Sequence, residues 1–298
     1  METLPLEEIY NIDQEVMIVN DSQELRIWSV EDFEIGRELG RGKQGKVFLA
    51  TETKTRQTYA LKCMEIDNIS KKRELDNMID IQSSLDHPNI LKIYGKLSKL
   101  TELSNGDYVS ETCLVLEYAC FGDLRSTVYP TLLLQGSEAQ PIVKKITSAL
   151  VYMHSKGVAY MDLKLENTVV TSDGEPKLTD FDLSRKFLPG TKFFNTKGTF
   201  VYLAPEMFVV DKEGFNEKVD AWSLGIFTYE LLVGHDPFNE HIWNKQWSVI
   251  PKVIFSVRDE VLQKITLKDA KDFVSKLLMP VKDRMTVEEA LRHPWLKN

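Results

Sequence analysis

The sequence predicts an α+β fold with two lobes, in which a small lobe of antiparallel strands precedes a larger and mainly helical lobe. Two observations favour this division. From Phe33 to Tyr118, short runs that alternate between apolar and polar residues are separated by turn residues, a pattern typical of strands. After Ala119, longer segments with helical periodicity follow. We therefore expect a hinge between the lobes near Glu117–Gly122.

The small lobe is expected to hold a sheet and a helix. Its strands are predicted at Phe33–Leu39, Lys46–Ala50, Thr58–Cys63, Ile90–Leu97 and Cys113–Tyr118. The first three of these strands form an antiparallel meander, because only a glycine-rich turn and a polar turn separate them. The helix is predicted over Ser70–Leu85, where apolar residues recur with helical spacing and His87-Pro88-Asn89 follows as a stop signal.

The larger lobe is expected to be built from helices. Pro141–Lys156 is amphipathic and is followed by Gly157, a residue type that commonly terminates helices. Asp220–Val233 is nearly all apolar, so we expect this helix to be buried. Val287–Arg292 is the last predicted helix. The predicted boundaries are 1–32 for an acidic extension, which fits either a packed arm or a loose tail, 33–119 for the small lobe and 120–298 for the larger lobe.

Composition and charge argue against several classes of protein. Of the 298 residues, 43% are hydrophobic and 28% are charged, which is typical of a soluble globular protein. The formal net charge of −8 argues against a protein that binds nucleic acid by neutralising phosphates, and it fits basic macromolecular partners. No apolar run approaches the ~20 residues that cross a bilayer. The acidic N-terminus does not resemble a secretory signal.

The cysteines favour a reducing compartment. The chain has 3 cysteines, Cys63, Cys113 and Cys120, and their spacing matches neither a disulfide framework nor a zinc site. We therefore expect plain thiols and a cytoplasmic location. The sequence leaves the oligomeric state open, and we favour a monomer.

A glycine-rich segment is the first motif with chemical content. Gly40-Arg41-Gly42-Lys43-Gln44-Gly45-Lys46-Val47 fits the pattern GxGxxGxV, in which glycines let backbone amides approach phosphate oxygens. The competing dinucleotide-binding motif opens a helix, whereas the residues after Gly45 alternate like a strand. Taken alone, the segment is also compatible with a glycine-rich hairpin turn that binds no ligand.

Further motifs follow this loop in a fixed order. They are Tyr59-Ala60-Leu61-Lys62, Asp162-Leu163-Lys164-Leu165-Glu166-Asn167, Asp180-Phe181, Gly198-Thr199-Phe200-Val201-Tyr202-Leu203-Ala204-Pro205-Glu206, Asp220-Ala221-Trp222-Ser223-Leu224-Gly225, Arg284 and His293-Pro294-Trp295. With these motifs in this order, from Phe33 to Leu296, the chain resembles the eukaryotic-type protein kinase family. The resemblance implies the bilobal protein-kinase fold and the use of ATP.

The resemblance also implies a catalytic group around Asp162. This carboxylate would accept or orient the proton of the substrate hydroxyl, and Lys164 would neutralise charge on the phosphoryl group in transfer. Lys164 and Thr199 together resemble the serine/threonine branch of the family rather than the tyrosine branch. The implied activity is transfer of the ATP γ-phosphate to serine or threonine hydroxyls of protein substrates.

Nucleotide and metal binding are implied in the same way. Lys62 would hold the α- and β-phosphates, Asp180 would chelate Mg²⁺ and Asn167 a second metal ion, and Mn²⁺ could replace Mg²⁺. Leu116 would stand beside adenine as the gatekeeper. Glu117 and Ala119 would offer hinge hydrogen bonds to adenine, and Asp123 could bind the ribose hydroxyls. The whole predicted nucleotide-binding set comprises Leu39, Gly40, Arg41, Gly42, Lys43, Gln44, Gly45, Lys46, Val47, Ala60, Lys62, Glu74, Leu116, Glu117, Ala119 and Asp123.

Other matched residues are expected to act on the structure. By resemblance, Glu206 and Arg284 form a buried ion pair in the larger lobe, and Asp220 caps the backbone near the catalytic loop. Losing one of these residues is expected to damage folding first and catalysis second.

The chain departs from the family pattern at two motifs. Met161 replaces the arginine that pairs with a phosphorylated activation-loop residue, so we expect activity that does not depend on that phosphorylation. Tyr160 fills the usual histidine position as an aromatic spacer. Asp182 replaces the glycine that permits the loop to flip, so we expect a single loop state and poor binding of inhibitors that need the flipped loop.

The helix glutamate that would pair with Lys62 is a further open point. The usual count back from His87 reaches Met78, and Glu74 lies one helical turn earlier on the same face. Either Glu74 is the partner, which we favour, or the pair is absent. In the second case Glu74 is an exposed helical charge beside Arg73.

Substrate preference is suggested by acidic residues. Asp123, Glu166 and Glu230 match positions where basophilic members of the family carry acids that receive substrate arginines. With the net charge of −8, this match favours substrates with arginine or lysine before the target residue. Ordinary solvated carboxylates are an equally good interpretation of the same residues.

Two other functions stay open at this point. A pseudokinase would be an ATP-binding scaffold without turnover, which the altered motifs at Tyr160-Met161 and Asp182 favour and the intact phosphate and metal residues disfavour. A small-molecule kinase is disfavoured by Thr199 and Arg284, which belong to the peptide-docking half of the pattern. The altered motifs also resemble those of a rapidly diverging, virus-encoded kinase, which would act in host cytoplasm and the virion.

Overall fold

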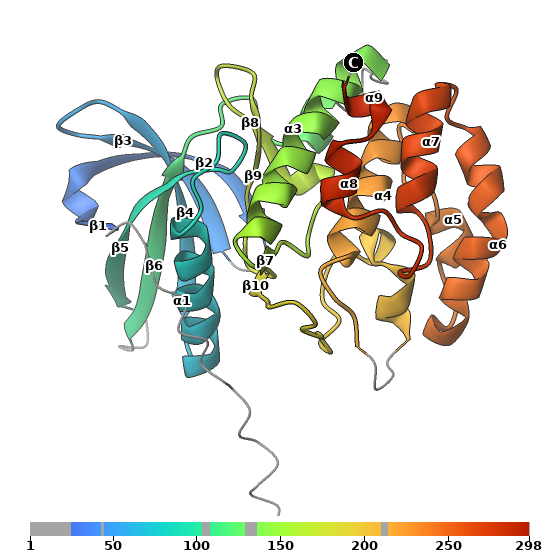
Figure 1. Ribbon diagram of the computed structural model, residues 1–298. Helices are drawn as coiled ribbons and strands as arrows, with labels where there is room; N and C mark the ends of the chain where they lie inside the picture. Colours follow the sequence, from blue (N-terminus) through green and yellow to red (C-terminus); the bar gives the residue numbers. More distant parts are fainter. Residues whose placement is uncertain (1–24, 43–44, 103–107, 129–135, 210–213, 298) are drawn as a thin grey trace, which may run out of the picture.

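A computed structural model describes residues 25–42, 45–102, 108–128, 136–209 and 214–297 of the chain. It has the two lobes that the sequence predicts, a β-rich N-lobe that includes helix α1 (Ile69–Ser83) and a mainly helical C-lobe (Figure 1). The predicted α+β bilobal fold is therefore confirmed.

The N-lobe is built on a six-stranded sheet in the order β1-β5-β6-β4-β3-β2. Strands β2, β3 and β4 form the predicted antiparallel meander, and β6 pairs antiparallel with both β4 and β5. Each strand predicted for this lobe overlaps an observed one. The observed bounds are β1 (Arg26–Trp28), β2 (Phe33–Gly42), β3 (Gly45–Glu52), β4 (Thr58–Ile66), β5 (Ile93–Glu102) and β6 (Tyr108–Glu117).

Strand β1 was not predicted, and it makes the end of the acidic extension part of the N-lobe. It pairs in parallel with β5, with Trp28 opposite Leu97. The buried Trp28 ring lies 4.9 Å from the ring of Phe33 and 5.8 Å from that of Tyr59. This part of the extension is a packed arm, whereas residues 1–24 lie outside the described residues.

Helix α1 begins where its sequence supplies a cap. The side chain of Asn68 accepts a hydrogen bond from the backbone amide of Lys71 at 2.9 Å, which satisfies a free amide of the first turn. The helix turns a buried face toward the sheet, formed by Leu75, Met78 and Ile81. The prediction of a helix over Ser70–Leu85 is confirmed apart from its ends.

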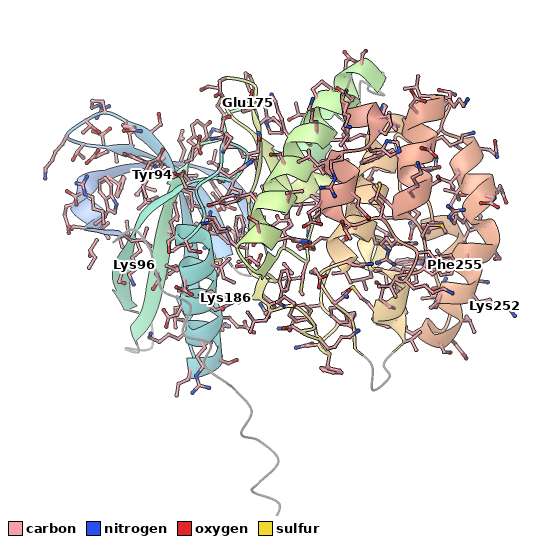
Figure 2. All side chains as sticks on the ribbon, viewed as in Figure 1. Tyr94, Lys96, Glu175, Lys186, Lys252 and Phe255 are labelled. Carbon is pink, nitrogen blue, oxygen red and sulfur yellow. A yellow bond between two sulfur atoms is a disulfide. The ribbon has the colours of Figure 1, made fainter. Side chains whose placement is uncertain are left out.

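Polar contacts join the two lobes. Lys186 lies beside α1 in Figure 2, and its Nζ is 2.6 Å from Asp80 Oδ2 of that helix. Between α1 and β5, the backbone amide of Leu91 donates to the carbonyl of Leu178 at 2.9 Å. The segment from Asp180 to Glu206, called the activation segment below, is therefore connected to the N-lobe just before it begins, at Leu178, and again at Lys186.

The C-lobe is helical, as predicted. Its helices are α2 (Leu124–Val128), α3 (Gly136–Ser155), α4 (Val219–Val233), α5 (Asn239–Ile242), α6 (Ile250–Gln263), α7 (Lys268–Leu277), α8 (Val287–Leu291) and α9 (Pro294–Lys297). Helix α3 starts ahead of Pro141, so the predicted start was too late. Helix α4 is buried along nearly its whole length, as its apolar sequence predicts. Among the described residues, no helix combines the length and the apolar character that a membrane crossing requires.

Short elements shape the cleft side of the C-lobe. Strand β7 (Val158–Ala159) pairs with β10 (Arg185–Lys186), and β8 (Thr168–Val170) pairs with β9 (Pro176–Leu178). Single 3₁₀ turns lie at Leu165–Asn167, Phe200–Tyr202, Pro205–Phe208 and Trp247–Val249 in the C-lobe, and one lies at Val30–Asp32 in the N-lobe. The catalytic-loop motif occupies the connection between β7 and β8.

The expected structural residues of the C-lobe are found in place. Arg284 Nη1 and Nη2 lie 2.6 and 2.8 Å from the two carboxylate oxygens of Glu206, and the Arg284 side chain is fully buried. Asp220 accepts hydrogen bonds from the backbone amides of Tyr160 at 2.8 Å and Met161 at 2.7 Å. Both structural predictions are confirmed.

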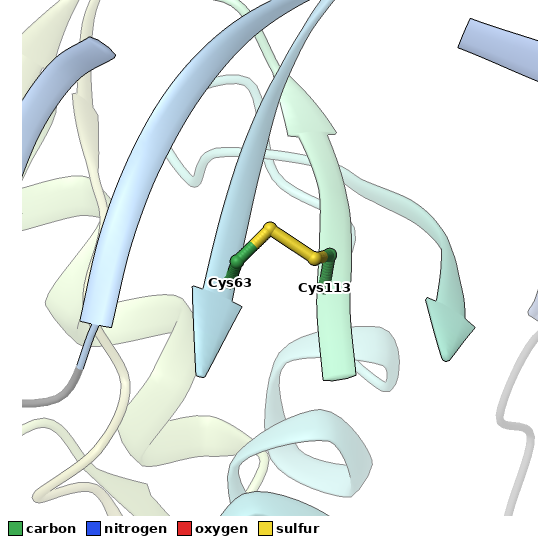
Figure 3. The surroundings of a disulfide bond; sticks show 2 residues. All are labelled: Cys63 and Cys113. Carbon is green, nitrogen blue, oxygen red and sulfur yellow. A yellow bond between two sulfur atoms is a disulfide. The ribbon is translucent and has the colours of Figure 1, made fainter. Parts of the chain in front are cut away.

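The prediction of plain thiols is wrong for Cys63 and Cys113, which form a disulfide between β4 and β6 (Figure 3). The two residues are direct partners in the antiparallel register, and their Cα atoms are 3.9 Å apart. They are separated by 50 positions in the chain, so only the strand order reveals that they meet. Cys120 is a free, exposed thiol.

Candidate active site

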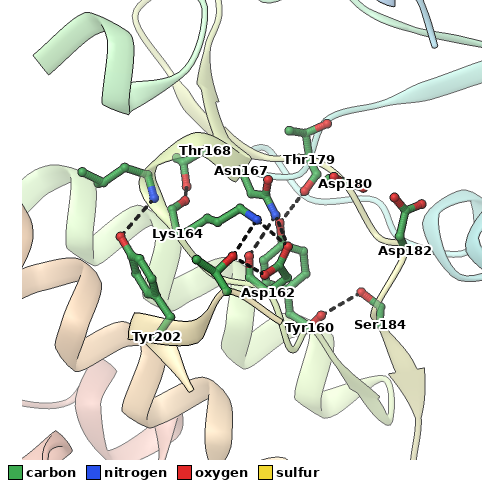
Figure 4. Close-up of polar contacts among 12 residues, drawn as sticks. Tyr160, Asp162, Lys164, Asn167, Thr168, Thr179, Asp180, Asp182, Ser184 and Tyr202 are labelled. Atoms are coloured by element: carbon green, nitrogen blue, oxygen red, sulfur yellow. Dashed lines mark hydrogen bonds and ion pairs between the residues drawn. The ribbon is translucent and has the colours of Figure 1, made fainter. Parts of the chain in front are cut away.

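The motif between β7 and β8 gathers polar side chains around Asp162 (Figure 4). Asp162 Oδ2 accepts hydrogen bonds from Lys164 Nζ at 2.8 Å and from Asn167 Nδ2 at 2.7 Å. Thr199 Oγ1 donates to Asp162 Oδ1 at 3.2 Å and accepts from Lys164 Nζ at 2.9 Å. The structure thus brings together four residues of the predicted catalytic set, with a carboxylate held between a cation and a hydroxyl. The fifth, Lys62, contacts Asp180 and Asp182 instead.

The backbone beneath this cluster is fixed by the buried Tyr160. Its ring packs at 5.4 Å from the ring of Phe181, and its hydroxyl donates to the carbonyl of Thr179. The next residue, Met161, has a left-handed backbone with φ of 67°. The predicted role of Tyr160 as an aromatic spacer in the core agrees with this packing.

Lys62 of β4 is held by both aspartates of Asp180-Phe181-Asp182. Its Nζ lies 2.9 Å from Asp180 Oδ1 and 3.1 Å from Asp182 Oδ2. Burial acts to lower the pKa of Lys62, but the charges of Asp180 and Asp182 outweigh it and raise that pKa. Lys62 therefore carries a full positive charge at the place expected for nucleotide phosphates.

The two aspartates differ in protonation. Burial, and after it the hydrogen bond with Asp180, raises the pKa of Asp182 to about 7. Burial acts in the same direction on Asp180, but the hydrogen bond from Asp182 and the charge of Lys62 prevail and lower its pKa to about 2. The two carboxyl groups titrate as a coupled pair in which Asp180 ionises at a lower pH than Asp182.

Glu74 is not the partner of Lys62 in this structure, so the favoured prediction is wrong. Its carboxylate lies 3.3 Å from Lys197 Nζ of the activation segment, and both side chains are about half exposed. The reason is local competition, because Asp180 and Asp182 already surround Lys62 while Glu74 faces outward from α1.

Asp180 and Asn167 have the donor atoms that suit a divalent cation. Asn167 Nδ2 donates to Asp162, which leaves the amide oxygen as its metal-binding atom, and the backbone carbonyl of Asn167 accepts from Thr179 at 3.0 Å. Thr179 directly precedes Asp180, so the two metal-binding candidates come from adjoining backbone segments. Carboxylate and amide oxygens are ligands that Mg²⁺ prefers, together with water and phosphate. The residues present therefore fit such an ion.

Comparison with known proteins decides the family. Residues 33–296 match the family model described as the protein kinase domain. The chain belongs to the protein kinase family. A protein kinase domain uses ATP and a divalent metal ion in general, in agreement with the geometry around Lys62 and Asp180.

Relatives of this kinase carry the name Aurora. The chain is 36% identical over 276 residues to Aurora kinase A-B of Xenopus laevis and covers 90% of its own length and 63% of that relative's. It is 37% identical over 269 residues to Aurora kinase of Schizosaccharomyces pombe (89% and 71% of the two chains) and 34% identical over 274 residues to Aurora kinase C of Mus musculus (91% and 93%). The kinase thus spans less than two thirds of the length of the Xenopus relative. These three relatives are not viral, so they do not support the viral origin that the altered motifs suggest, and that origin stays a prediction.

The hinge of the kinase shows which adenine contacts its backbone can make. Leu116 is buried opposite Ala60 of β4, as expected for residues that border the adenine pocket. The amide of Glu117 already donates to the carbonyl of Lys92 at 2.9 Å, so the carbonyl of Glu117 is the group that adenine would meet. The amide of Ala119 is the other predicted hinge contact and stays a prediction.

The glycine loop of the kinase is described at both ends but not at Lys43 and Gln44, which lie outside the described residues. A side chain at Gly45 would meet the carbonyl oxygen of Cys63 at 2.0 Å, so this glycine is required by the approach of β3 to β4. At Gly40 and Gly42 an added Cβ would meet nothing within 4 Å. Steric packing therefore explains Gly45, whereas packing does not explain Gly40 and Gly42, and the expected approach of phosphate to these two glycines stays a prediction.

The acids predicted for substrate or ribose already have partners within the kinase. Asp123 caps α2, because its Oδ1 accepts from the Ser126 amide at 2.8 Å and its Oδ2 accepts from the Ser126 hydroxyl at 2.9 Å. Glu166 and Glu230 both bind Arg125, which the sequence analysis did not single out. The sequence did offer a signal for this pairing, because Arg125 is a cation only two residues after Asp123, one of the predicted substrate acids.

Proposed function

We propose that this protein is a serine/threonine protein kinase that transfers the γ-phosphate of ATP with Mg²⁺. The observation that carries the proposal is a pair of polar clusters, Lys62 with Asp180 and Asp162 with Lys164 and Thr199, which lie close enough for the charge of Lys164 to act on Asp180. Phosphoryl transfer depends on charge placement more than on covalent chemistry, and these clusters supply that placement. The naming of the relatives as Aurora kinases supports it.

In this mechanism the chain's residues position charge around an in-line displacement. The substrate hydroxyl oxygen bonds to the γ-phosphorus as the bond to the ADP oxygen breaks, and the hydroxyl proton passes to Asp162. Lys164 stands 2.8 Å from Asp162 and neutralises charge on the phosphoryl oxygens. Lys62 holds the α- and β-phosphates. Asp180 and Asn167 would hold Mg²⁺, or Mn²⁺ in its place, and the bound ion would neutralise charge on the phosphates.

Radiolabelled ATP tests the proposal directly. The purified protein is incubated with labelled ATP, Mg²⁺ and either basic or acidic test proteins, and labelled residues are identified after acid hydrolysis. We expect phosphoserine or phosphothreonine, and a loss of at least about 10³-fold in rate for Asp162→Asn. Label that is equal in the Asp162→Asn protein would refute the assignment.

A scaffold that binds ATP without turnover is the second candidate. It is favoured by the way Asp182 competes with phosphate for Lys62 and by the pairing of Glu74 with Lys197 in place of Lys62. The radiolabel assay, together with a thermal-shift titration, separates the two candidates. A scaffold would bind Mg²⁺-ATP in the titration but would label none of the test proteins. The intact catalytic cluster makes the active enzyme our choice.

We further propose that activity does not need phosphorylation of the activation loop. Met161 offers no cation for a phosphate, and the hydroxyl of Thr196 instead donates to the carbonyl of Met207 at 2.9 Å. The double variant Thr191→Ala/Thr196→Ala is expected to keep its rate within about threefold, because no phosphate-dependent contact is lost. A rate reduced by more than about tenfold, with melting temperature unchanged, would contradict this.

Three further predictions concern the setting of the enzyme. The favoured state is a monomer, which light scattering can check. The proposed location is cytoplasmic, although the cysteines no longer favour it because Cys63 and Cys113 form a disulfide. The altered motifs also favour similarity to the serine/threonine kinase of African swine fever virus, in which case host cytoplasm and the virion are the expected locations. Immunolabelling of infected cells and purified virions is the test, and absence from both would refute it.

The expected preference for basic substrates rests on Asp123, Glu166 and Glu230. A peptide array that varies the residues before the target hydroxyl tests it. Glu166 and Glu230 already pair with Arg125 within the chain, and this pairing bears on whether a substrate arginine can reach them.

A further inference from the structure

A buried cluster of opposite charges lies beside the catalytic loop. Arg125, in helix α2, places its Nη1 at 2.6 Å from Glu230 Oε1 of α4 and its Nε at 3.0 Å from Glu166 Oε1. Tyr202 donates its hydroxyl to the other carboxylate oxygen of Glu230 and accepts from the backbone amide of Leu165 at 3.4 Å. One guanidinium thus bridges the two carboxylates.

Both carboxylate oxygens of Glu230 have partners within this cluster. Its side chain is only 1% exposed, and each of its carboxylate oxygens has a partner, Arg125 on one side and Tyr202 on the other. Burial raises the pKa of Glu230, while Tyr202 and Arg125 act against that rise by stabilising the charged form. Arg125, at 33% exposure, reaches from this buried carboxylate to the surface, where Glu166 is 43% exposed.

The cluster adjoins the surface over which a substrate chain must pass. Glu166 follows Asp162 in the same loop, and Leu165 and Tyr202 connect that loop to the segment of Thr199. A peptide whose hydroxyl reaches Asp162 therefore has neighbouring residues near Glu166 and Arg125. A cation from the peptide would meet a guanidinium before it met Glu230.

Exchange of one guanidinium for another offers no net gain in binding. A substrate arginine could reach Glu230 only by displacing Arg125, and the displaced group would lose the charge-assisted hydrogen bonds that the incoming group makes. Repulsion between the two guanidinium groups adds a cost for basic substrates. The acids alone suggest a preference for basic residues, whereas the acids with Arg125 do not.

We propose that Arg125 is a specificity-determining residue that fills the acidic subsite from within the chain. The kinase therefore does not select arginine or lysine at the positions that precede the target serine or threonine. This inference rests on the proposed function. It replaces the expected basic preference with a neutral one at the subsite formed by Glu166 and Glu230.

Peptide kinetics test the inference. Each peptide carries one serine, and arginine is placed in turn at each of the preceding positions, with alanine as the reference. For the natural sequence we expect the ratio of kcat/KM for arginine over alanine to stay below about threefold at every position. In Arg125→Ala, we expect that ratio to rise about 10- to 100-fold at one or two positions, the effect of one new charge-assisted hydrogen-bonded pair.

Two further variants guard against a purely structural effect. Arg292→Ala removes an exposed arginine at the end of α8 and is expected to leave the ratio unchanged. Arg125→Ala/Glu230→Gln removes the charge of Arg125 and that of the buried Glu230, so it avoids an unpaired Glu230 and is expected to lose the gain of arginine selectivity. Because the readout is a ratio between two peptides, lower overall activity of a variant does not affect it.

The possible results are distinct. A natural enzyme that already favours arginine more than about tenfold overturns the inference, as does an Arg125→Ala enzyme whose ratio equals that of the natural sequence. If no peptide or test protein is phosphorylated by the natural enzyme under Mg²⁺-ATP, the proposed kinase function itself is refuted. Phosphorylation of the alanine peptide with no arginine preference, together with the gain in Arg125→Ala, supports both.

Discussion

Glu206 and Arg284 provide the sharpest prediction about stability. The perturbation is Glu206→Gln, which keeps the size of the side chain and removes its charge. Arg284 would retain the carbonyls of Met279 and Lys218, each 3.0 Å from one of its nitrogens, but would lose the carboxylate that neutralises it. Its side chain is 0% exposed, so water cannot replace the missing partner.

The magnitude follows from that burial. Breaking a buried ion pair by removing one partner costs about 3–5 kcal/mol, because an uncompensated charge stays in the interior. For a chain of this size, each kcal/mol lowers the melting temperature by about 2–3 °C. We therefore expect Glu206→Gln to melt about 6–15 °C below the natural protein.

The assay is thermal unfolding followed by circular dichroism, with Asp76→Asn as the matched control. Asp76 forms an ion pair with Lys72 at 2.8 Å, but these side chains are 53% and 65% exposed. Exposed pairs contribute about 0–1 kcal/mol, so this control should shift the melting temperature by less than about 3 °C. Equal shifts in the two variants would refute the reasoning that burial decides the cost.

Three other predictions follow from described contacts. Burial acts to lower the pKa of His154, but the hydrogen bond and charge of Asp220, with the charges of Glu288 and Glu217, together outweigh burial and raise that pKa above 6.5. The resulting stability is present below about pH 6.5 and is lost as pH rises through the folded value. Thermal melts between about pH 6 and pH 9 should show this loss, and His154→Gln should reduce it. Reduction of the Cys63–Cys113 disulfide, which closes a separation of 50 residues, should lower the free energy of unfolding by about 4 kcal/mol in urea titrations, and Cys63→Ser should be insensitive to the reductant. Asp182→Gly should increase affinity for inhibitors that need the flipped loop by at least about tenfold, since the contact to Lys62 at 3.1 Å is lost; equal Kd values in calorimetry would oppose this.

Much of the site could be predicted because its residues lie in short motifs with fixed spacing. Asp162, Lys164 and Asn167 share one loop, so the sequence itself sets their separation, and the structure joins them by hydrogen bonds. Thr199 belongs to a second motif, and its contact with Asp162 follows from the order of the motifs. The division into two lobes could likewise be predicted, because the hydrophobic periodicity changes from that of strands to that of helices after Ala119.

Contacts between separate elements were harder to predict. The Cys63–Cys113 bond depends on β6 lying beside β4 in a particular register, and sequence spacing carries no trace of that register. Glu74 lies on the expected helix, but the choice between Lys62 and Lys197 is set by competition with two aspartates. In each case the deciding partner is distant in the chain, so a local pattern cannot reveal it.

Strand β1 bears on where this enzyme can be shortened. The matched family region begins at Phe33, and a protein cut there would lack Trp28, which is 5% exposed and covered on one side by the guanidinium of Arg26 at 3.4 Å from its ring. Removing this strand would leave the backbone groups of β5 without their hydrogen-bond partners at the sheet edge, a surface prone to pairing with other chains. Expression of the catalytic region in soluble form should therefore require a start ahead of Leu25.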